Sequence, residues 1–400
     1  MYVKRHLEKD ILQYIRTREV LAVVGPRQCG KTTLLKHIFK DLKNAIYLDF
    51  EDRENLELFD QDIKSFAELY AKPYDYLFID EFQYAKEGGK NLKYIYDNHK
   101  VKIIISGSSA SGLAIRSIKY LVGRIFVFNL YPFSFEEYLN HKEPALYEIY
   151  LKRKLTKPVI LRLLPHFSEF CIYGGYPRVA LSATKGEKET VLKNIYNTYF
   201  LKEIKEILNL PEDYKLSKLI NALALQIGNV INYNELSGIT GLNHGDLLNK
   251  INILEKTFIC LRGLPFHTNK RTELVKAPKI FFLDAGFRNT VIKNFQPIGN
   301  RQDKGALYEN FVASEICKKG LDVKYWRTKS KAEVDFVIEK GGSAVPVEIK
   351  SHLKTAKLTK SFASFISKYA PKKGLVLSET LSAEAGKIRF RPILSISKEI

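Results

Sequence analysis

The sequence predicts an α/β protein in which a parallel sheet near the N-terminus is followed by smaller modules. Short apolar runs of strand length, such as residues 20–24, alternate with segments whose apolar residues recur at helical spacing. Uninterrupted apolar runs are typical of strands that are covered on both faces of a parallel sheet. A chain of 400 residues is too long for one hydrophobic core, so we expect two or three domains.

A glycine-containing loop follows the first apolar run. Residues 25–32 read Gly-Pro-Arg-Gln-Cys-Gly-Lys-Thr and fit G-x-x-x-x-G-K-[ST], the P-loop pattern, and helical spacing begins directly afterwards. The amides of such a loop and the helix N-terminus face a phosphate chain. Lys31 is predicted to reach the β- and γ-phosphates, and the Thr32 hydroxyl to hold Mg²⁺. The predicted ligands are therefore ATP and Mg²⁺.

The third strand-like run, residues 76–81, ends in two acids and has the Walker B pattern. Open α/β sheets bind ligands at the carboxyl ends of their strands, so this end should lie beside the P-loop. Asp80 is predicted to bind Mg²⁺ and Glu81 to orient the attacking water. The predicted nucleotide-binding residues are Gly25, Pro26, Arg27, Gln28, Cys29, Gly30, Lys31, Thr32, Thr33 and Asp80.

Two further runs complete the expected sheet. Residues 102–106 precede Gly-Ser-Ser, which is either a polar contact to the nucleotide or a serine turn that caps the next helix. Residues 125–128 follow Arg124 and are closed by Pro132. An arginine near a γ-phosphate stabilises transition-state charge, in cis or from a neighbouring subunit, so Arg124 is either catalytic or a surface residue.

Together these stretches resemble a family of archaeal and bacterial AAA-type P-loop ATPases, which is allied to the signalling ATPases with many domains. The matching segments are residues 25–32, 77–81, 106–109, 123–124 and 174–177. The resemblance implies ATP hydrolysis, a sensor strand in which Ser106 or Ser108 contacts the γ-phosphate or the water, and a C-terminal domain of poorly known role. We expect residues 1–195 to form the ATPase core with a helical lid, interrupted at Gly174-Gly175 by a hinge or a close backbone approach.

Residues 196–295 are predicted to form a winged-helix module. Helical spacing at 216–227 is followed by two short helices around a glycine turn within 234–254, and apolar runs then flank a basic loop at 267–276. Recognition helices read bases with polar side chains, while basic residues contact phosphates. Such modules also bind proteins, so both partners remain open. The candidate DNA contacts are Asn243, His244, Asn249, Lys250, Lys270 and Arg271.

Residues 296–400 have the element order of a restriction-endonuclease-like fold: a helix, three strands, a helix and a strand. Asp335, Glu348 and Lys350 fit D-x12-E-x-K on adjacent strands, and Glu309 lies on the preceding helix. The three carboxylates are predicted to share Mg²⁺ for phosphodiester cleavage, with Lys350 stabilising charge. The alternative is a degenerate nuclease fold that is kept for binding or for salt-bridged packing.

Charge favours a polyanionic partner. The net charge is +20, from 64 basic and 44 acidic residues, and residues 350–378 contain no acid. Lys354, Lys357 and Lys360 lie in this stretch and are predicted to bind double-stranded DNA. A lysine-rich overall composition or a thermophile's surface is the alternative explanation for the net charge, and a solvated helix face is the alternative for these lysines.

The sequence thus predicts an AAA-type P-loop ATPase with a helical lid, a winged helix and a restriction-endonuclease-like tail. We expect a nucleotide-driven switch on DNA with a metal-dependent nuclease tail, or an ATP-regulated scaffold or signalling ATPase whose tail is inactive. A second copy or another protein is an additional candidate partner. No apolar run reaches about 18 residues and the N-terminus is charged, so we expect no membrane partner and a cytoplasmic protein. The four cysteines lie far apart and are expected to be reduced.

Overall fold

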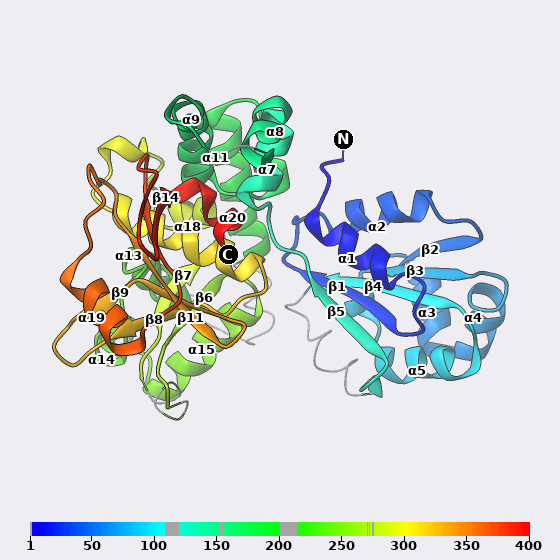
Figure 1. Ribbon diagram of the computed structural model, residues 1–400. Coiled ribbons are helices and arrows are strands. Elements are labelled where there is room, and N and C mark those ends of the chain that lie inside the picture. The colour runs from blue at the N-terminus through cyan, green and yellow to red at the C-terminus, as the bar shows by residue number, and fades with distance from the viewer. Residues whose placement is uncertain are drawn as a thin grey trace. The chain divides into compact units, whose positions relative to one another are not determined.

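The computed structural model describes residues 2–108, 120–152, 155–200, 214–269, 271, 273 and 276–400 (Figure 1). The chain divides into two compact units. Of the described residues, unit 1 contains 2–132 and 256–258, and unit 2 contains 133–200, 214–255 and the part from 259 onward. No helix in the described ranges combines the length and apolarity needed to cross a membrane.

Unit 1 is built on a five-stranded sheet in the order β2-β3-β4-β1-β5. Every neighbouring pair is parallel, as the apolar runs predicted. The strands are β1 (Val20–Gly25), β2 (Ala45–Asp49), β3 (Tyr76–Asp80), β4 (Lys102–Ser108) and β5 (Ile125–Asn129).

Helices cover both faces of this sheet. They are α1 (His6–Tyr14), α2 (Lys31–Lys40), α3 (Arg53–Gln61), α4 (Ile63–Tyr70) and α5 (Gly88–Asn98). Figure 1 shows α1 and α2 on one side and α3 to α5 on the other. Because side chains alternate along a strand, Leu21 of β1 packs with Leu34 of α2, whereas Ala22 packs in the opposite layer with Phe59 of α3. Burial on both faces explains why the strands are apolar throughout.

A set of helices that the sequence placed in the ATPase core belongs to unit 2. These helices are α7 (Phe135–Lys142), α8 (Pro144–Lys152), α9 (Lys157–Tyr173), α10 (Pro177–Leu181) and α11 (Lys185–Asn194). Phe135 forms edge-to-face ring contacts with Phe167 of α9 and with Phe311 of a later helix. The expected lid therefore packs against the C-terminal part of the chain, and its apolar faces supply one core with it.

The segment predicted as a winged helix contains the expected helices and strands. They are α13 (Tyr214–Leu225), α14 (Tyr233–Thr240), α15 (His244–Lys256), β6 (Cys260–Pro265), β7 (Lys279–Phe282) and α17 (Ala285–Val291). Gly241 ends α14 with φ 67°, which suits a glycine at that turn. β6 and β7 pair antiparallel, but β6 also pairs with a later strand. The hairpin is thus part of a larger sheet, and the winged-helix assignment stays a prediction.

The C-terminal part contains more elements than the predicted helix, three strands, helix and strand, and the restriction-endonuclease-like fold stays a prediction. The elements of this part are α18 (Lys304–Lys318), β8 (Lys324–Arg327), β9 (Glu333–Val334), β10 (Phe336–Lys340), β11 (Ser343–Ile349), α19 (Lys360–Tyr369), β12 (Gly374–Ser378), β13 (Ala383–Ala385), β14 (Ile388–Pro392) and α20 (Ile396–Glu399). One sheet has the order β10-β11-β12-β14-β13, whereas β8 and β9 complete a four-stranded sheet, β7-β6-β8-β9. The three predicted strands therefore divide between two sheets.

The Gly174-Gly175 pair makes a close backbone approach. A Cβ on Gly174 would lie 2.1 Å from Asp284 Oδ1, and a Cβ on Gly175 would lie 2.3 Å from the Phe133 carbonyl oxygen. Asp284 caps α17 by accepting from the Phe287 amide at 2.9 Å and also accepts from the Gly175 amide at 2.7 Å. The two glycines leave the space that this buried cap needs. Close backbone contact within unit 2 therefore accounts for the glycine pair.

Candidate functional site

The P-loop connects β1 to α2 at the carboxyl edge of the sheet in unit 1. A Cβ on Gly25 would lie 2.1 Å from the Leu130 carbonyl oxygen, so the residue that ends β1 must be glycine. Gly30 has φ 97° and stands at the N-cap of α2, a conformation that L-residues rarely adopt. The loop is therefore shaped by two glycines for separate reasons, one steric and one conformational.

A buried arginine that was not predicted from the sequence bonds to the backbone of the P-loop. Arg5 is 5% exposed, and its guanidinium donates to the carbonyl oxygens of Cys29 at 2.9 Å and Tyr131 at 2.6 Å. It ties the loop to the segment that follows β5. Nothing in the local pattern distinguishes Arg5 from the other charges of the N-terminal helix, so the sequence held no signal for this role.

Lys31 points into the loop. Its side chain is buried, and Nζ donates to the carbonyl oxygens of Gly25 and Pro26, each at 3.0 Å. The ammonium therefore lies against the backbone of the P-loop, and its contact with the β- and γ-phosphates stays a prediction.

Asp80 ends β3 and is held by three donors. It is 1% exposed, and its carboxylate accepts from the Tyr47 hydroxyl at 2.7 Å, from the Ser106 hydroxyl and from the Glu81 amide at 3.1 Å. Burial, and then the charge of Asp80, raises the pKa of the Tyr47 hydroxyl, which therefore remains a donor. Of the two candidate serines, Ser106 thus contacts the Walker B aspartate. Tyr47 was not predicted, because strand β2 gives no sign of what lies beside it.

Glu81 is linked to β4 through Gln83. Glu81 has φ 51°, in the left-handed region. The Gln83 side-chain amide donates to the Glu81 carboxylate, and its oxygen accepts from the Ser108 amide at 3.1 Å. Gln83 therefore joins the predicted water-orienting acid to β4 and was missed by sequence reasoning.

The residues predicted for Mg²⁺ fit that ion in unit 1. Mg²⁺ in nucleotide sites takes one or two protein oxygens and otherwise phosphate and water. Thr32 at the start of α2 and Asp80 at the end of β3 supply such oxygens at the same edge, where β1 and β3 flank β4. Within the described ranges, no group of three or more His, Cys, Asp or Glu side chains is placed to hold a metal ion by itself.

Arg124 lies at the opposite edge of the sheet. Its carbonyl accepts from the amide of Val20, the first residue of β1, at 2.8 Å, and its Nε lies 3.3 Å from Asp97 Oδ1. The P-loop begins at Gly25, five residues further along β1, which is about 17 Å at a strand rise of about 3.3 Å per residue. The structure therefore corrects the cis alternative: Arg124 does not reach the P-loop of its own chain.

The carboxylates predicted for the tail do come together in unit 2. Glu348 on β11 lies 2.9 Å from Lys350 Nζ and accepts from the Thr359 hydroxyl at 2.8 Å. Asp335 accepts from the Ile349 amide at 2.7 Å. Burial, and then the charge of Asp335, raises the pKa of Glu309, and burial also raises the pKa of Asp335.

A lysine that was not predicted belongs to the same cluster. Lys279, at the start of β7, is 2% exposed, and its Nζ lies 2.5 Å from Glu333 Oε1 and 3.6 Å from Glu309 Oε2. Burial alone lowers the pKa of Lys279, but the charges of Glu309 and Glu333 outweigh burial and raise it, so the ammonium is retained. An ammonium group bonded to these acids is not a metal-ligand arrangement, and the residues here do not fit Mg²⁺.

The predicted DNA contacts have different surroundings. Lys354, Lys357, Lys360 and Arg271 are exposed. Lys250 is only 7% exposed, so the structure corrects its assignment as a base contact of the recognition helix. Lys270 lies outside the described residues.

The polar residues at the start of α15 also have partners of their own. Asn243 accepts from the Asp246 amide at 2.8 Å and thus holds the first turn of the helix. The ring of His244 lies edge-on to Tyr233, with 4.9 Å between centroids.

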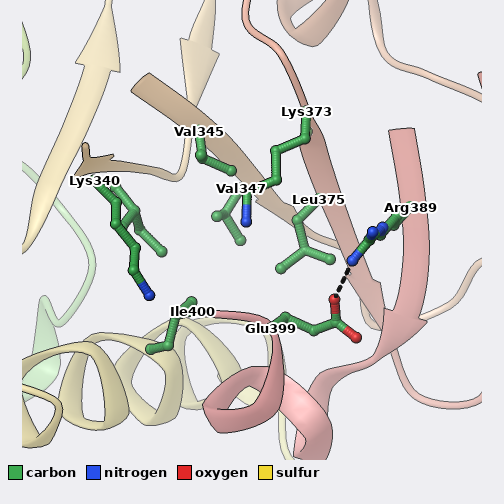
Figure 2. Close-up of a pocket in the computed structure, with 10 residues that line it drawn as sticks. Lys340, Val345, Val347, Lys373, Leu375, Arg389, Glu399 and Ile400 are labelled. Carbon is green, nitrogen blue, oxygen red and sulfur yellow. Dashed lines mark hydrogen bonds and ion pairs between the residues drawn. The ribbon is translucent and has the colours of Figure 1, made fainter. Parts of the chain in front are cut away.

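A further hollow in unit 2 has an apolar floor and a charged rim. Figure 2 shows Val345, Val347 and Leu375 between Lys340 and Arg389, and Arg389 pairs with Glu399 at 3.5 Å. Its cavity volume is ≈ 20 Å³. Such a volume holds about one water, whereas ligand pockets are roughly 300–1,000 Å³. This hollow therefore supports no ligand.

Comparison with known families separates the chain into three matches. Residues 17–139 match the family model described as an AAA domain. The matched part, from β1 to the start of α7, contains the P-loop, the acids at the end of β3 and strand β4 just described. This segment is therefore similar to AAA-type P-loop ATPase domains. Residues 164–297 and 304–394 match two domains of unknown function, DUF8612 and DUF4143.

Relatives extend over most of the chain. An uncharacterized protein of Haemophilus influenzae is 25% identical over 373 residues, which is 87% of this chain and 86% of that one. An uncharacterized protein of Methanocaldococcus jannaschii is 26% identical, with 97% of this chain and 88% of that one covered. Among solved structures, the Walker-type ATPase of Pyrococcus abyssi matches with a TM-score of 0.47 at 16% identity, covering 73% of this chain and 96% of that one.

Proposed function

We propose that the protein is a Mg²⁺-dependent ATPase that acts as a nucleotide-driven switch. The observation that carries this proposal is the carboxyl edge of unit 1, where the P-loop with Lys31 follows β1 and the acids Asp80 and Glu81 stand at the end of β3. The bonds from Lys31 to loop carbonyls are replaced by bonds to the β- and γ-phosphates when ATP enters. Thr32 and Asp80 would supply the protein oxygens for Mg²⁺, which would neutralise phosphate charge.

The hydrolytic step is assigned to Glu81. Its carboxylate orients and polarises the attacking water, and the Gln83 amide fixes the direction of that carboxylate. The Ser108 amide donates to the side chain of Gln83, which itself bonds Glu81. Gln83 therefore couples a contact between β4 and the γ-phosphate to the position of the Glu81 carboxylate. Ser106 keeps Asp80 in place.

Binding of a fluorescent ATP analogue tests the first step. Lys31→Ala should remove most of the affinity, because the β- and γ-phosphate charge loses its ammonium partner. Lys36→Ala, an exposed lysine of the same helix, is the matched control and should bind like wild type. Equal affinity for Lys31→Ala and wild type would contradict the proposed site.

We propose that the partner that completes the site is a second copy of the chain. Arg124 is 37% exposed at the amino edge of the sheet and does not reach its own P-loop, so its catalytic role is in trans. The exposed guanidinium is thus available to the P-loop of another protomer.

For the tail we propose DNA binding without metal-dependent cleavage. Lys354, Lys357 and Lys360 are exposed, and the carboxylates nearby are paired with lysines. Binding of duplex DNA should weaken as salt is added. Changing the three lysines to Gln should flatten the slope of log binding constant against log salt concentration by roughly 2–3 units, at about 0.9 per phosphate contacted. An unchanged slope would show that these lysines face only solvent.

A further inference from the structure

The cluster in unit 2 consists of acids from several elements that surround one lysine. Lys279 comes from β7, Glu309 from α18 and Glu333 from β9. Its Nζ pairs with both acids, at 3.6 and 2.5 Å, and Asp335, just after β9, interacts electrostatically with the same ammonium. The ring of Tyr325 lies beside it, with 5.5 Å from Nζ to the ring centroid.

Each acid of the D-x12-E-x-K pattern already has a cation. Lys350 pairs with Glu348 at 2.9 Å. Asp335 interacts electrostatically with both Lys279 and Lys350. Arg327 Nε lies 3.5 Å from Glu333 Oε2 on the outer side. Buried carboxylates need such compensation, because an uncompensated buried charge is strongly destabilising.

We propose that Lys279 is the resident cation of this cluster: its ammonium neutralises the acids in place of a divalent metal and clamps β7 to α18 and β9. A metal ion would have to displace a lysine that is 2% exposed and paired with two acids. The inference rests on the contacts of unit 2 and does not depend on ATP hydrolysis.

The clamp also joins two parts of the chain that match different families. Lys279 lies within the match at residues 164–297, whereas its acidic partners lie within the match at 304–394. The Asn310 side chain adds a second connection at the same place, since it accepts from the Phe282 amide at 2.7 Å and donates to the Phe282 carbonyl at 3.0 Å. The cluster therefore functions as a charged link between β7 and the C-terminal part.

Binding of Mn²⁺ to the full chain tests the inference by calorimetry and electron paramagnetic resonance. The variants are Asp335→Asn, Lys279→Met and the two combined. Subtracting the amount of Mn²⁺ bound by Asp335→Asn accounts for Mn²⁺ that is bound at sites outside the cluster. Wild type and Asp335→Asn should bind the same amount. Lys279→Met should gain one equivalent, which the double variant loses. Lys372→Met, an exposed lysine of unit 2, is the matched control and should gain none.

Two results would overturn the inference. The first is Mn²⁺ bound stoichiometrically by wild type and lost in Asp335→Asn. The second is a folded Lys279→Met variant that gains no site. If Lys279→Met does not fold, the comparison of wild type with Asp335→Asn still decides, and Lys279→Arg, which keeps the charge, should fold and bind no additional Mn²⁺.

Discussion

Arg124 provides the sharpest prediction about how the ATPase domain assembles. The start of β1 and the P-loop are five residues apart, or about 17 Å, which an arginine side chain cannot span. Arg124 also pairs with Asp97 and lies over the Tyr96 ring, with 5.8 Å from the guanidinium carbon to the centroid. Because an arginine supplied in trans accelerates phosphoryl transfer by about 10³–10⁵, Arg124→Ala should lower kcat by roughly 10³-fold with nucleotide affinity unchanged.

Mixing variants separates a trans role from local damage. Lys31→Ala retains Arg124 and cannot bind ATP, whereas Arg124→Ala binds ATP and lacks the arginine. In a two-fold dimer formed at random from equal amounts, about a quarter of the wild-type turnover should return. Arg18→Ala is the control, because Arg18 lies on the same Tyr96 ring at 4.5 Å. No recovery on mixing folded variants, or a full rate for Arg124→Ala, would refute the assignment.

Three further predictions concern Gln83, the carboxylate cluster and Gly286. Gln83→Ala should lower kcat roughly 10–100-fold with ATP affinity unchanged, since Glu81 loses its support; a change in affinity alone, by steady-state kinetics, would contradict this. Because burial raises the pKa values of Glu309 and Asp335, the folded state binds more protons than the unfolded chain above about pH 4.3, so the free energy of unfolding should fall as pH rises from about 5 to 8. In urea titrations, Glu309→Gln should reduce the decrease in the free energy of unfolding between about pH 5 and pH 8. A pH dependence equal to that of wild type would contradict the raised pKa of Glu309. Gly286→Ala would place a Cβ 2.0 Å from the Tyr173 carbonyl oxygen and should cost about 1–3 kcal/mol, whereas Gly305→Ala, in α18 with nothing within 4 Å, should not lower the unfolding temperature.

The sequence predicted those features that depend on neighbouring residues. The loop at Gly25 to Thr32, the acids at the end of β3 and the parallel sheet follow from local patterns, and the sheet is as predicted. Tyr47, Gln83 and Lys279 could not be found in this way, because each matters through a contact that only the folded chain creates.

The packing partners of an amphipathic helix are similarly hidden. The helices from α7 to α11 show apolar faces in the sequence, but the pattern does not say which core those faces join. Phe135 meets Phe311, 176 positions later, and this contact places α7 in unit 2. The sequence could in principle have shown on which edge of the sheet Arg124 lies. Arg124 precedes a strand and the P-loop follows one, so in a parallel sheet the two lie at opposite edges.

The most direct test of the central claim is ATP turnover by Glu81→Gln compared with wild type. Wild type should hydrolyse ATP only with Mg²⁺, and Glu81→Gln should bind the nucleotide with unchanged affinity while kcat falls roughly 10²-fold or more. Glu87→Gln, whose exposed acid pairs with Lys90 at 2.8 Å, is the control and should turn over like wild type. A Glu81→Gln variant that hydrolyses ATP at the wild-type rate would contradict the account.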